Sequence, residues 1–218
     1  MDQPISKPRA IIWFGFGLAA LVLAGLFMVI TFNPRPVRSK ALPVYGQIAD
    51  FNLTNQDGQA VSLANLKGHV WVADVIFTRC PGPCLKMSRQ MHELQQRLAQ
   101  NTQVRLVTVT TDPEFDTAPV LKTYAGRFAA DPNRWWFLTG ASKEITALVG
   151  GSLKLTALAK SAEERQSPAD LFIHSTIFVM VDKHGQLREI IETTGEGVQP
   201  QQVQAQLLAG ILQLERES

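Results

Sequence analysis

Two cysteines, Cys80 and Cys84, lie in the stretch FTRCPGPC and are the only cysteines of the 218-residue chain. Because only three residues separate them, one helical turn or a tight loop can bring both sulfurs to the same point. Two adjacent thiols can form a disulfide, exchange electrons with another protein, or bind one soft metal ion together. A disulfide that only braces the fold is the weakest interpretation, because closing so short a loop removes little entropy from the unfolded chain.

The elements on either side of the cysteines indicate how they are positioned. The preceding stretch HVWVADVIF, residues 69–77, is almost continuously apolar and predicts a strand buried on both faces. Pro83 suits the first turn of a helix, whose apolar stripe is formed by Met87, Met91, Leu94 and Leu98. At the start of a helix the backbone dipole favours negative charge, so we expect thiolates to be stabilised here. Arg79 adds to this effect if its side chain faces the sulfurs.

The rest of the chain from residue 44 on alternates between strand and helix patterns. Asp57-Gly58 lies at the centre of a hairpin predicted over residues 49–63. Further strands are expected over 103–112, 135–140, 175–182 and 187–192, and helices over 118–128, from Ser142 onward and over 199–214. Residues 151–173 are expected to form a long connection. The predicted class is α/β: a mixed central sheet with flanking helices and an N-terminal β-hairpin.

The front of the chain predicts a membrane anchor. Residues 10–32 are 23 residues without a charge, long enough for a helix to cross a bilayer. A cleaved signal peptide is the alternative, but the apolar run exceeds the usual h-region and no A-x-A-like site follows it. The predicted organisation is a short tail over 1–9, a transmembrane helix over 10–32, a proline-rich linker over 33–43 and one domain over 44–218.

Charge excludes nucleic acid as a partner. Residues 41–218 contain 16 Lys and Arg against 18 Asp and Glu, and 16 − 18 gives a net charge of −2. Proteins that bind nucleic acid usually carry a basic face or a clustered basic motif, and the sequence contains no such cluster.

Four stretches together resemble a known family: DVIFTRCPGPC, TVTTDPEFDTAPVLKTYAGRF, RWWFLTG and HSTIFVMVDKHGQLR. In order and spacing they are similar to the SCO/SenC family of membrane-anchored copper chaperones for cytochrome c oxidase. The resemblance implies a thioredoxin-like fold that binds one copper ion, as Cu(I) or Cu(II), through Cys80, Cys84 and His174. It also implies that the partner is the copper-binding subunit of the oxidase. Leu85 departs from the family, where many members have proline.

His174 is distinguished from the other histidines by its place before a predicted strand. There, thioredoxin-like oxidoreductases carry a cis-proline beside their dithiol, whereas this chain has His-Ser-Thr. We expect His69, His92 and His184 to be solvated. Asp74 matches the place of the buried acid of thioredoxins and is equally well explained as a structural strand residue. Asp112 is expected to organise a turn, and a role behind the metal ligands is the less favoured alternative.

Three functions are therefore compatible with the sequence. The first is a copper chaperone without turnover, and the second is a thiol-disulfide oxidoreductase that reduces the copper-ligand cysteines of an oxidase subunit or of another exported protein. A peroxidase is disfavoured, because no residues suited to activating a peroxide are evident. We expect a single-pass protein of a bacterial inner membrane, with its domain in the periplasm, where dithiols can oxidise.

Overall fold

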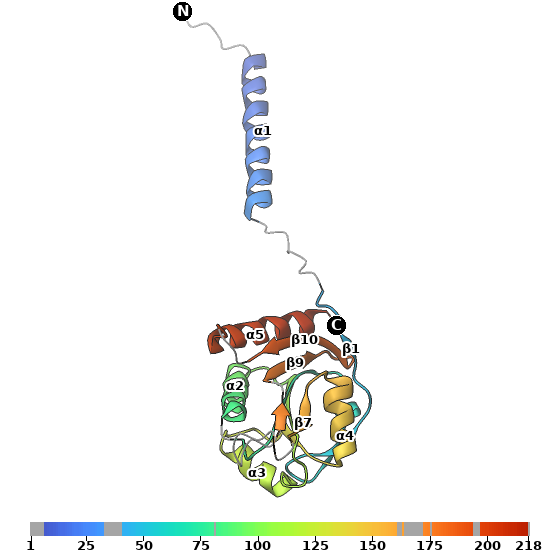
Figure 1. Ribbon diagram of the computed structural model, residues 1–218. Helices are drawn as coiled ribbons and strands as arrows, with labels where there is room; N and C mark the ends of the chain where they lie inside the picture. Colours follow the sequence, from blue (N-terminus) through green and yellow to red (C-terminus); the bar gives the residue numbers. More distant parts are fainter. Residues whose placement is uncertain are drawn as a thin grey trace, which may run out of the picture. The chain divides into compact units, whose positions relative to one another are not determined.

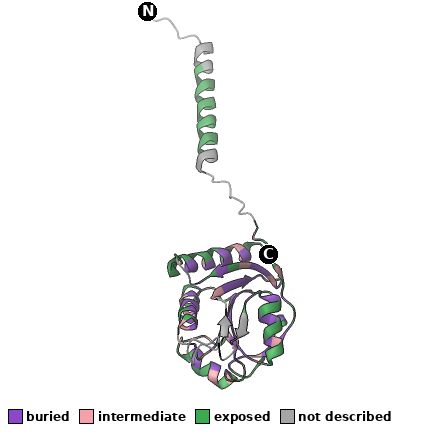
Figure 2. Cartoon of the chain, viewed as in Figure 1, coloured by how far each residue is buried: buried purple, intermediate pink, exposed green. Residues whose placement is uncertain are grey.

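The chain divides into two units, Met1–Lys40 and Ala41–Ser218 (Figure 1). The computed structural model describes residues 7–32, 41–80, 82–160, 163, 172–174, 176–193 and 197–217. The first unit contains helix α1, Lys7–Phe32, whose side chains are described over residues 13–28 and are all exposed (Figure 2). Among the described residues, no helix is long and apolar enough to span a membrane. The predicted anchor over 10–32 lies within α1 and extends at both ends beyond residues 13–28, the part of the helix whose side chains are described.

The second unit alternates strands and helices, as the sequence predicts. Its strands are β1 Gly46–Gln47, β2 Asn52–Thr54, β3 Ala60–Ser62, β4 Val70–Ile76, β5 Val104–Thr110, β6 Trp135–Leu138, β7 Ala157–Ala159, β8 Phe172–His174, β9 Ile177–Val181 and β10 Gln186–Glu192. Its helices are α2 Pro83–Arg97, α3 Ala118–Gly126, α4 Ser142–Thr146 and α5 Pro200–Arg216, with a 3₁₀ turn η1 at Leu63–Asn65 and a π-helical turn η2 at Ala147–Ser152.

The central sheet has six strands in the described part of the chain, in the order β1-β10-β9-β4-β5-β6. β4, β5 and β6 are parallel, whereas β9 is antiparallel to β4, and β10 and β1 continue the sheet in antiparallel pairs. Parallel neighbours need crossover helices, which α2 and α3 provide. The predicted mixed sheet with flanking helices is confirmed.

β4 is buried along its whole length, and its side chains alternate between two hydrophobic clusters. Val70, Val72 and Ile76 pack on the face covered by α2, α3 and α5. Trp71, Ala73 and Val75 pack on the opposite face, against α4, η2 and the β2–β3 hairpin. Helices thus cover both faces of the sheet, which explains why the strand reads as a continuous apolar run.

Two short pairings depart from the sequence-based expectations. The hairpin around Asp57-Gly58 is present as β2 and β3, with Gly58 at φ 78°, but it forms its own two-stranded sheet. Within the connection expected over 151–173, β7 pairs with β8 in a second two-stranded sheet, so that expectation is wrong over these residues. His174 consequently ends one strand, three positions before β9 begins, instead of only preceding a strand.

A buried arginine fastens the start of the domain to its end. Arg188 on β10 donates hydrogen bonds to the carbonyl oxygens of Leu42 and Pro43, at 2.7 and 3.1 Å, and to the carboxylates of Asp182 and Glu217. Leu42 also donates its N–H to Glu217 at 3.0 Å. Burial alone would lower the pKa of Arg188, but its bonds to Asp182 and Glu217 raise it, so the guanidinium remains charged. We call Arg188 with its partners Leu42, Pro43, Asp182 and Glu217 the Arg188 clamp.

The Arg188 clamp and the cysteines lie at opposite ends of the sheet. Asp182 directly follows Val181, which is paired with Trp71 near the start of β4. The cysteines instead follow Ile76, the last residue of the same strand. The polypeptide therefore enters the domain at the end of β4 that is remote from the dithiol.

Candidate metal centre

The cysteines occupy the connection between β4 and α2, as predicted. A turn closes after the strand, where the Cys80 N–H donates to the carbonyl of Phe77 at 3.1 Å. Pro83 then occupies the first turn of α2, so its missing N–H leaves no hydrogen bond unmade. Cys80 is 6% exposed and Cys84 is fully buried, and both thiols are reduced.

The two thiols interact directly with each other. A hydrogen bond with the Cys80 side chain is the largest cause that raises the pKa of Cys84, and burial raises it further. A backbone hydrogen bond at Phe77 acts in the opposite direction without offsetting them. The expectation that the helix start stabilises thiolates is therefore wrong for Cys84 in the metal-free protein. A soft cation that binds both sulfurs must displace this proton.

Asp74 lies on the α2 side of β4. Its position alternates with Val72 and Ile76, which belong to the cluster that contains both cysteines. It is fully buried, and its charge contributes to raising the pKa of Cys84. The structure thus places this acid at the same face as the dithiol, in the position that the sequence suggested.

Asp116 anchors the loop that leads into the cysteines. Its buried carboxylate accepts hydrogen bonds from the Thr78 N–H at 3.0 Å, from the Thr78 hydroxyl and from the Thr110 hydroxyl. These contacts join the residue two positions before Cys80 to the end of β5. Thr117 occupies the N-cap position of α3, and the sequence did not predict the role of Asp116.

Arg79 contacts the loop after β5, which also contains Asp116. Its guanidinium forms an ion pair with Asp112 and lies 4.2 Å from the ring centre of Phe115. Asp112 also organises the predicted turn, since its carbonyl accepts the N–H groups of Phe115 and Asp116 at 3.1 and 2.8 Å. The DPEFDT motif, residues 112–117, therefore supports the cysteine loop through two separate side chains.

His174 lies at the end of β8, in the β7–β8 hairpin. The backbone pairs His174 with Ala157, while the His174 side chain lies outside the described residues. Among the described side chains, no group of three His, Cys, Asp or Glu residues is arranged to hold a metal. The two cysteines are thus together in the structure, and the third predicted ligand stays a prediction.

The other histidines belong to the surface of the fold. His69 and His92 each place Nδ1 beside a backbone carbonyl, at 2.9 Å from Gln103 and 2.7 Å from Phe128 respectively. His184 is exposed in the β9–β10 turn. The expectation that these histidines are solvated is correct for His184. His69 and His92 each also contact a backbone carbonyl.

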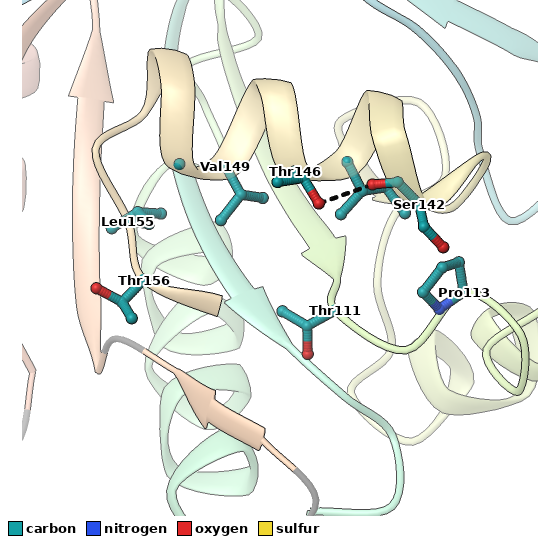
Figure 3. A pocket seen from close by; sticks show the side chains of 9 residues that line it. Thr111, Pro113, Ser142, Thr146, Val149, Leu155 and Thr156 are labelled. Atoms are coloured by element: carbon teal, nitrogen blue, oxygen red, sulfur yellow. Dashed lines mark hydrogen bonds between the residues drawn. The ribbon is translucent and has the colours of Figure 1, made fainter. Parts of the chain in front are cut away.

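A hollow of about 340 Å³ adjoins the hairpin that carries His174 (Figure 3). Thr111 and Pro113 of the loop after β5 form one side of it, and Leu155 and Thr156, which lead into β7, form another. Helix α4 closes it with Ser142 and Thr146, which are joined by a 2.8 Å hydrogen bond to the Ser142 carbonyl. The described residues that line it contribute hydroxyl and aliphatic groups.

Comparison with known proteins identifies the family. The profile of SCO1/SenC matches residues 43–209, which include the cysteine loop, the DPEFDT motif and the β7–β8 hairpin. The chain belongs to the SCO1/SenC family. It is 38% identical over 147 residues to the SCO1 protein homolog of Bacillus subtilis, covering 66% of this chain and 73% of that protein.

Solved structures of the SCO1/SenC family share the fold. BsSco, described as a member of the Sco family of cytochrome c oxidase assembly proteins with a disulfide switch, superposes with a TM-score of 0.63 at 31% identity, covering 79% of this chain and 98% of that one. Bradyrhizobium japonicum ScoI with copper bound superposes with a TM-score of 0.60 at 23% identity, covering 74% and 97%. At that identity the second likeness concerns the fold alone.

Proposed function

We propose that this SCO1/SenC protein is a copper chaperone that holds one copper ion between Cys80, Cys84 and His174 and passes it to the copper-binding subunit of cytochrome c oxidase. The observation that carries the proposal is the dithiol itself: two reduced, buried thiols in hydrogen-bonding contact, presented by a braced loop. Two thiolates and one imidazole are a soft donor set that suits Cu(I) and accepts Cu(II). The role in cytochrome c oxidase assembly named for BsSco, which is 31% identical to this chain, supports this assignment.

The protein's own contribution is to hold a proton on Cys84 where a cation is to be bound. Since the pKa of Cys84 is raised, its thiol is neutral without a metal, and binding of copper releases this proton as the thiolate forms. Asp74, buried on the same face, is placed to receive such a proton. Copper is the cargo, so the bound state must be stable enough to form and labile enough to be emptied.

Removing the three ligands one at a time tests the assignment. Cys80→Ala or Cys84→Ala should abolish tight binding of Cu(I) and Cu(II) while the domain stays folded, because the reduced thiols form no covalent cross-link. His174→Ala should retain a weaker two-sulfur Cu(I) site, lose the Cu(II) form and fail to support oxidase maturation in cells. Metal stoichiometry, visible absorption and oxidase activity of membranes are the measurements.

A thiol-disulfide oxidoreductase is the second candidate, favoured by the adjacency of two reduced thiols and by the disulfide switch named for BsSco. Dithiol exchange needs both cysteines and does not need an imidazole ligand. If His174→Ala supports normal oxidase assembly while either cysteine variant does not, copper transfer is the wrong assignment and dithiol exchange replaces it.

We further propose that residues 10–32 anchor the protein in a bacterial inner membrane, with residues 41–218 in the periplasm. The proposal is supported by the uncharged run of 23 residues and by the helix α1 that contains it. The full chain should fractionate with membranes, and protease added from the periplasmic side should degrade the domain. A mature protein that starts near residue 33 would remove the anchor, and a protected domain would reverse the topology.

A further inference from the structure

The exposed side of α2, next to the dithiol, is positively charged. Lys86 and Arg89 lie one turn apart on this helix, and Arg127 follows the end of α3; all three are exposed. In the described part of the chain none of the three forms an ion pair with a carboxylate. Because residues 41–218 carry a net charge of −2, this cluster of cations opposes the overall charge of the domain.

A hollow of about 450 Å³ lies between α2 and the end of α3, and we name it the basic groove. Its lining, in the part of the chain that the structure describes, includes two arginines and one histidine and no acidic residue: Leu85, Arg89, His92, Gly126, Arg127, Phe128 and Ala129. Leu85 directly follows Cys84, so the groove begins beside the dithiol. Leu85 and Phe128 give it an apolar wall under the cations.

Arg89 also lines a second hollow, of about 370 Å³, on the other flank of α2. That hollow contains one acid, Glu93, which is paired with Arg97 at 2.7 Å. Lys86 lies at its edge together with Arg89. Arg89 therefore stands between two depressions with its charge available to a ligand from either side.

We propose that the basic groove docks an acidic segment of the protein partner, with carboxylates on Arg89 and Arg127 and apolar side chains against Leu85 and Phe128. Guanidinium groups bind carboxylates in a two-pronged geometry. A partner segment bound in the groove would bring the partner's own metal ligands toward the dithiol. The inference rests on the proposed function, since it assigns the surface through which copper or electrons are exchanged. A walled groove favours a polypeptide over a lipid surface, which needs a flat or protruding basic face.

The test uses a variant of the groove and a control with the same change in charge. The groove variant combines Arg89→Gln with Arg127→Gln, and the control combines Lys67→Gln with Lys143→Gln, two exposed cations on the opposite side of the sheet. The probe is the metal-free copper domain of the oxidase subunit from the same organism. The association rate constant is measured by stopped-flow between about 20 and 500 mM salt.

The wild-type protein and the control should associate at similar rates that fall at least about tenfold as salt rises. The groove variant should associate about tenfold more slowly at low salt and depend less on salt, with its Cu(I) affinity unchanged. If the groove variant matches the control, the inference is wrong even when copper transfer proceeds. It is also wrong if only binding to vesicles of anionic lipid is lost. A wild-type protein that binds no copper would refute the proposed function instead. The association rates would still show whether the partner docks at the basic groove.

Discussion

At the scale of single residues, Asp116 determines the shape of the cysteine loop without being placed to bind a metal. It accepts three hydrogen bonds at a site where water is excluded, two of them from Thr78. Buried donors that lose their acceptor retain the full cost of desolvation. The position of Cys80 is thus coupled to a carboxylate 36 positions later in the chain.

Asp116→Ala should lower the free energy of unfolding by about 1–3 kcal/mol and weaken Cu(I) binding by about tenfold or more, because Thr78 loses its acceptor. Glu114→Ala removes an exposed carboxylate from the same motif and should change neither quantity. Urea denaturation and competition with a Cu(I) chelator measure the two effects. A variant with reduced stability and unchanged copper affinity would restrict Asp116 to a structural role.

The sequence predicted the dithiol and its setting but not this brace. Cys80 and Cys84 were recognisable because a buried strand and a helix start have strong local patterns, and Asp112 because a residue before proline favours a turn. The contact between Asp116 and Thr78 depends on the parallel pairing of β4 with β5, which no local pattern encodes. The direction of the pKa shift at Cys84 was also missed, since it arises from the partner thiol and from burial.

At the scale of elements, α2 carries the dithiol at one end and packs into the core along its length. Met87, Met91 and Leu94 are fully buried in the cluster that α2 shares with α3 and α5. The methionines are thus core residues, as the helical spacing predicted. Their packing fixes the helix whose first turn contains Cys84.

Met91→Ala should cost about 2–5 kcal/mol of stability, the usual range for deleting a long buried side chain. Met91→Leu keeps the volume and should leave both stability and Cu(I) affinity nearly unchanged. Gln96→Ala, at an exposed position of the same helix, is the control. Loss of copper binding in the leucine variant would show instead that the Met91 sulfur takes part in handling the metal.

Elements with many apolar residues were predicted well, and very short strands without a turn signal were not. The hairpin of β2 and β3 was found because Asp57-Gly58 provides the turn with its positive φ. β1 contains two residues and β7 contains three, too few to show a period, and their partners lie far away in the chain. The strand that carries His174 therefore appeared only in the structure.

At the scale of the whole molecule, the Arg188 clamp connects the first residues of the domain to the last. Hydrogen bonds from Gln213, Leu42 and Arg188 lower the pKa of Glu217, although burial acts in the opposite sense. A carboxyl whose pKa is lower in the folded state stabilises the fold at pH values above its unfolded pKa. This stabilisation is lost as the pH falls through the folded value.

Glu217→Gln should therefore reduce the free energy of unfolding at neutral pH, and the difference from the wild-type protein should shrink as the pH falls below about 4.5. Chemical denaturation at several pH values measures this. Glu192→Gln, at an exposed position of β10, serves as the control. A difference that persists unchanged at low pH would mean that the charge of Glu217 contributes nothing.

The Arg188 clamp also has a mechanical consequence. A pull on the N-terminal segment is carried by Leu42 and Pro43 into Arg188, and from there into β10 and the end of α5. The load is taken up at the end of the sheet remote from Cys80 and Cys84, so the sulfurs are shielded from tension. Tension applied at Leu42 and Pro43 should then leave the distance between the two sulfurs unchanged.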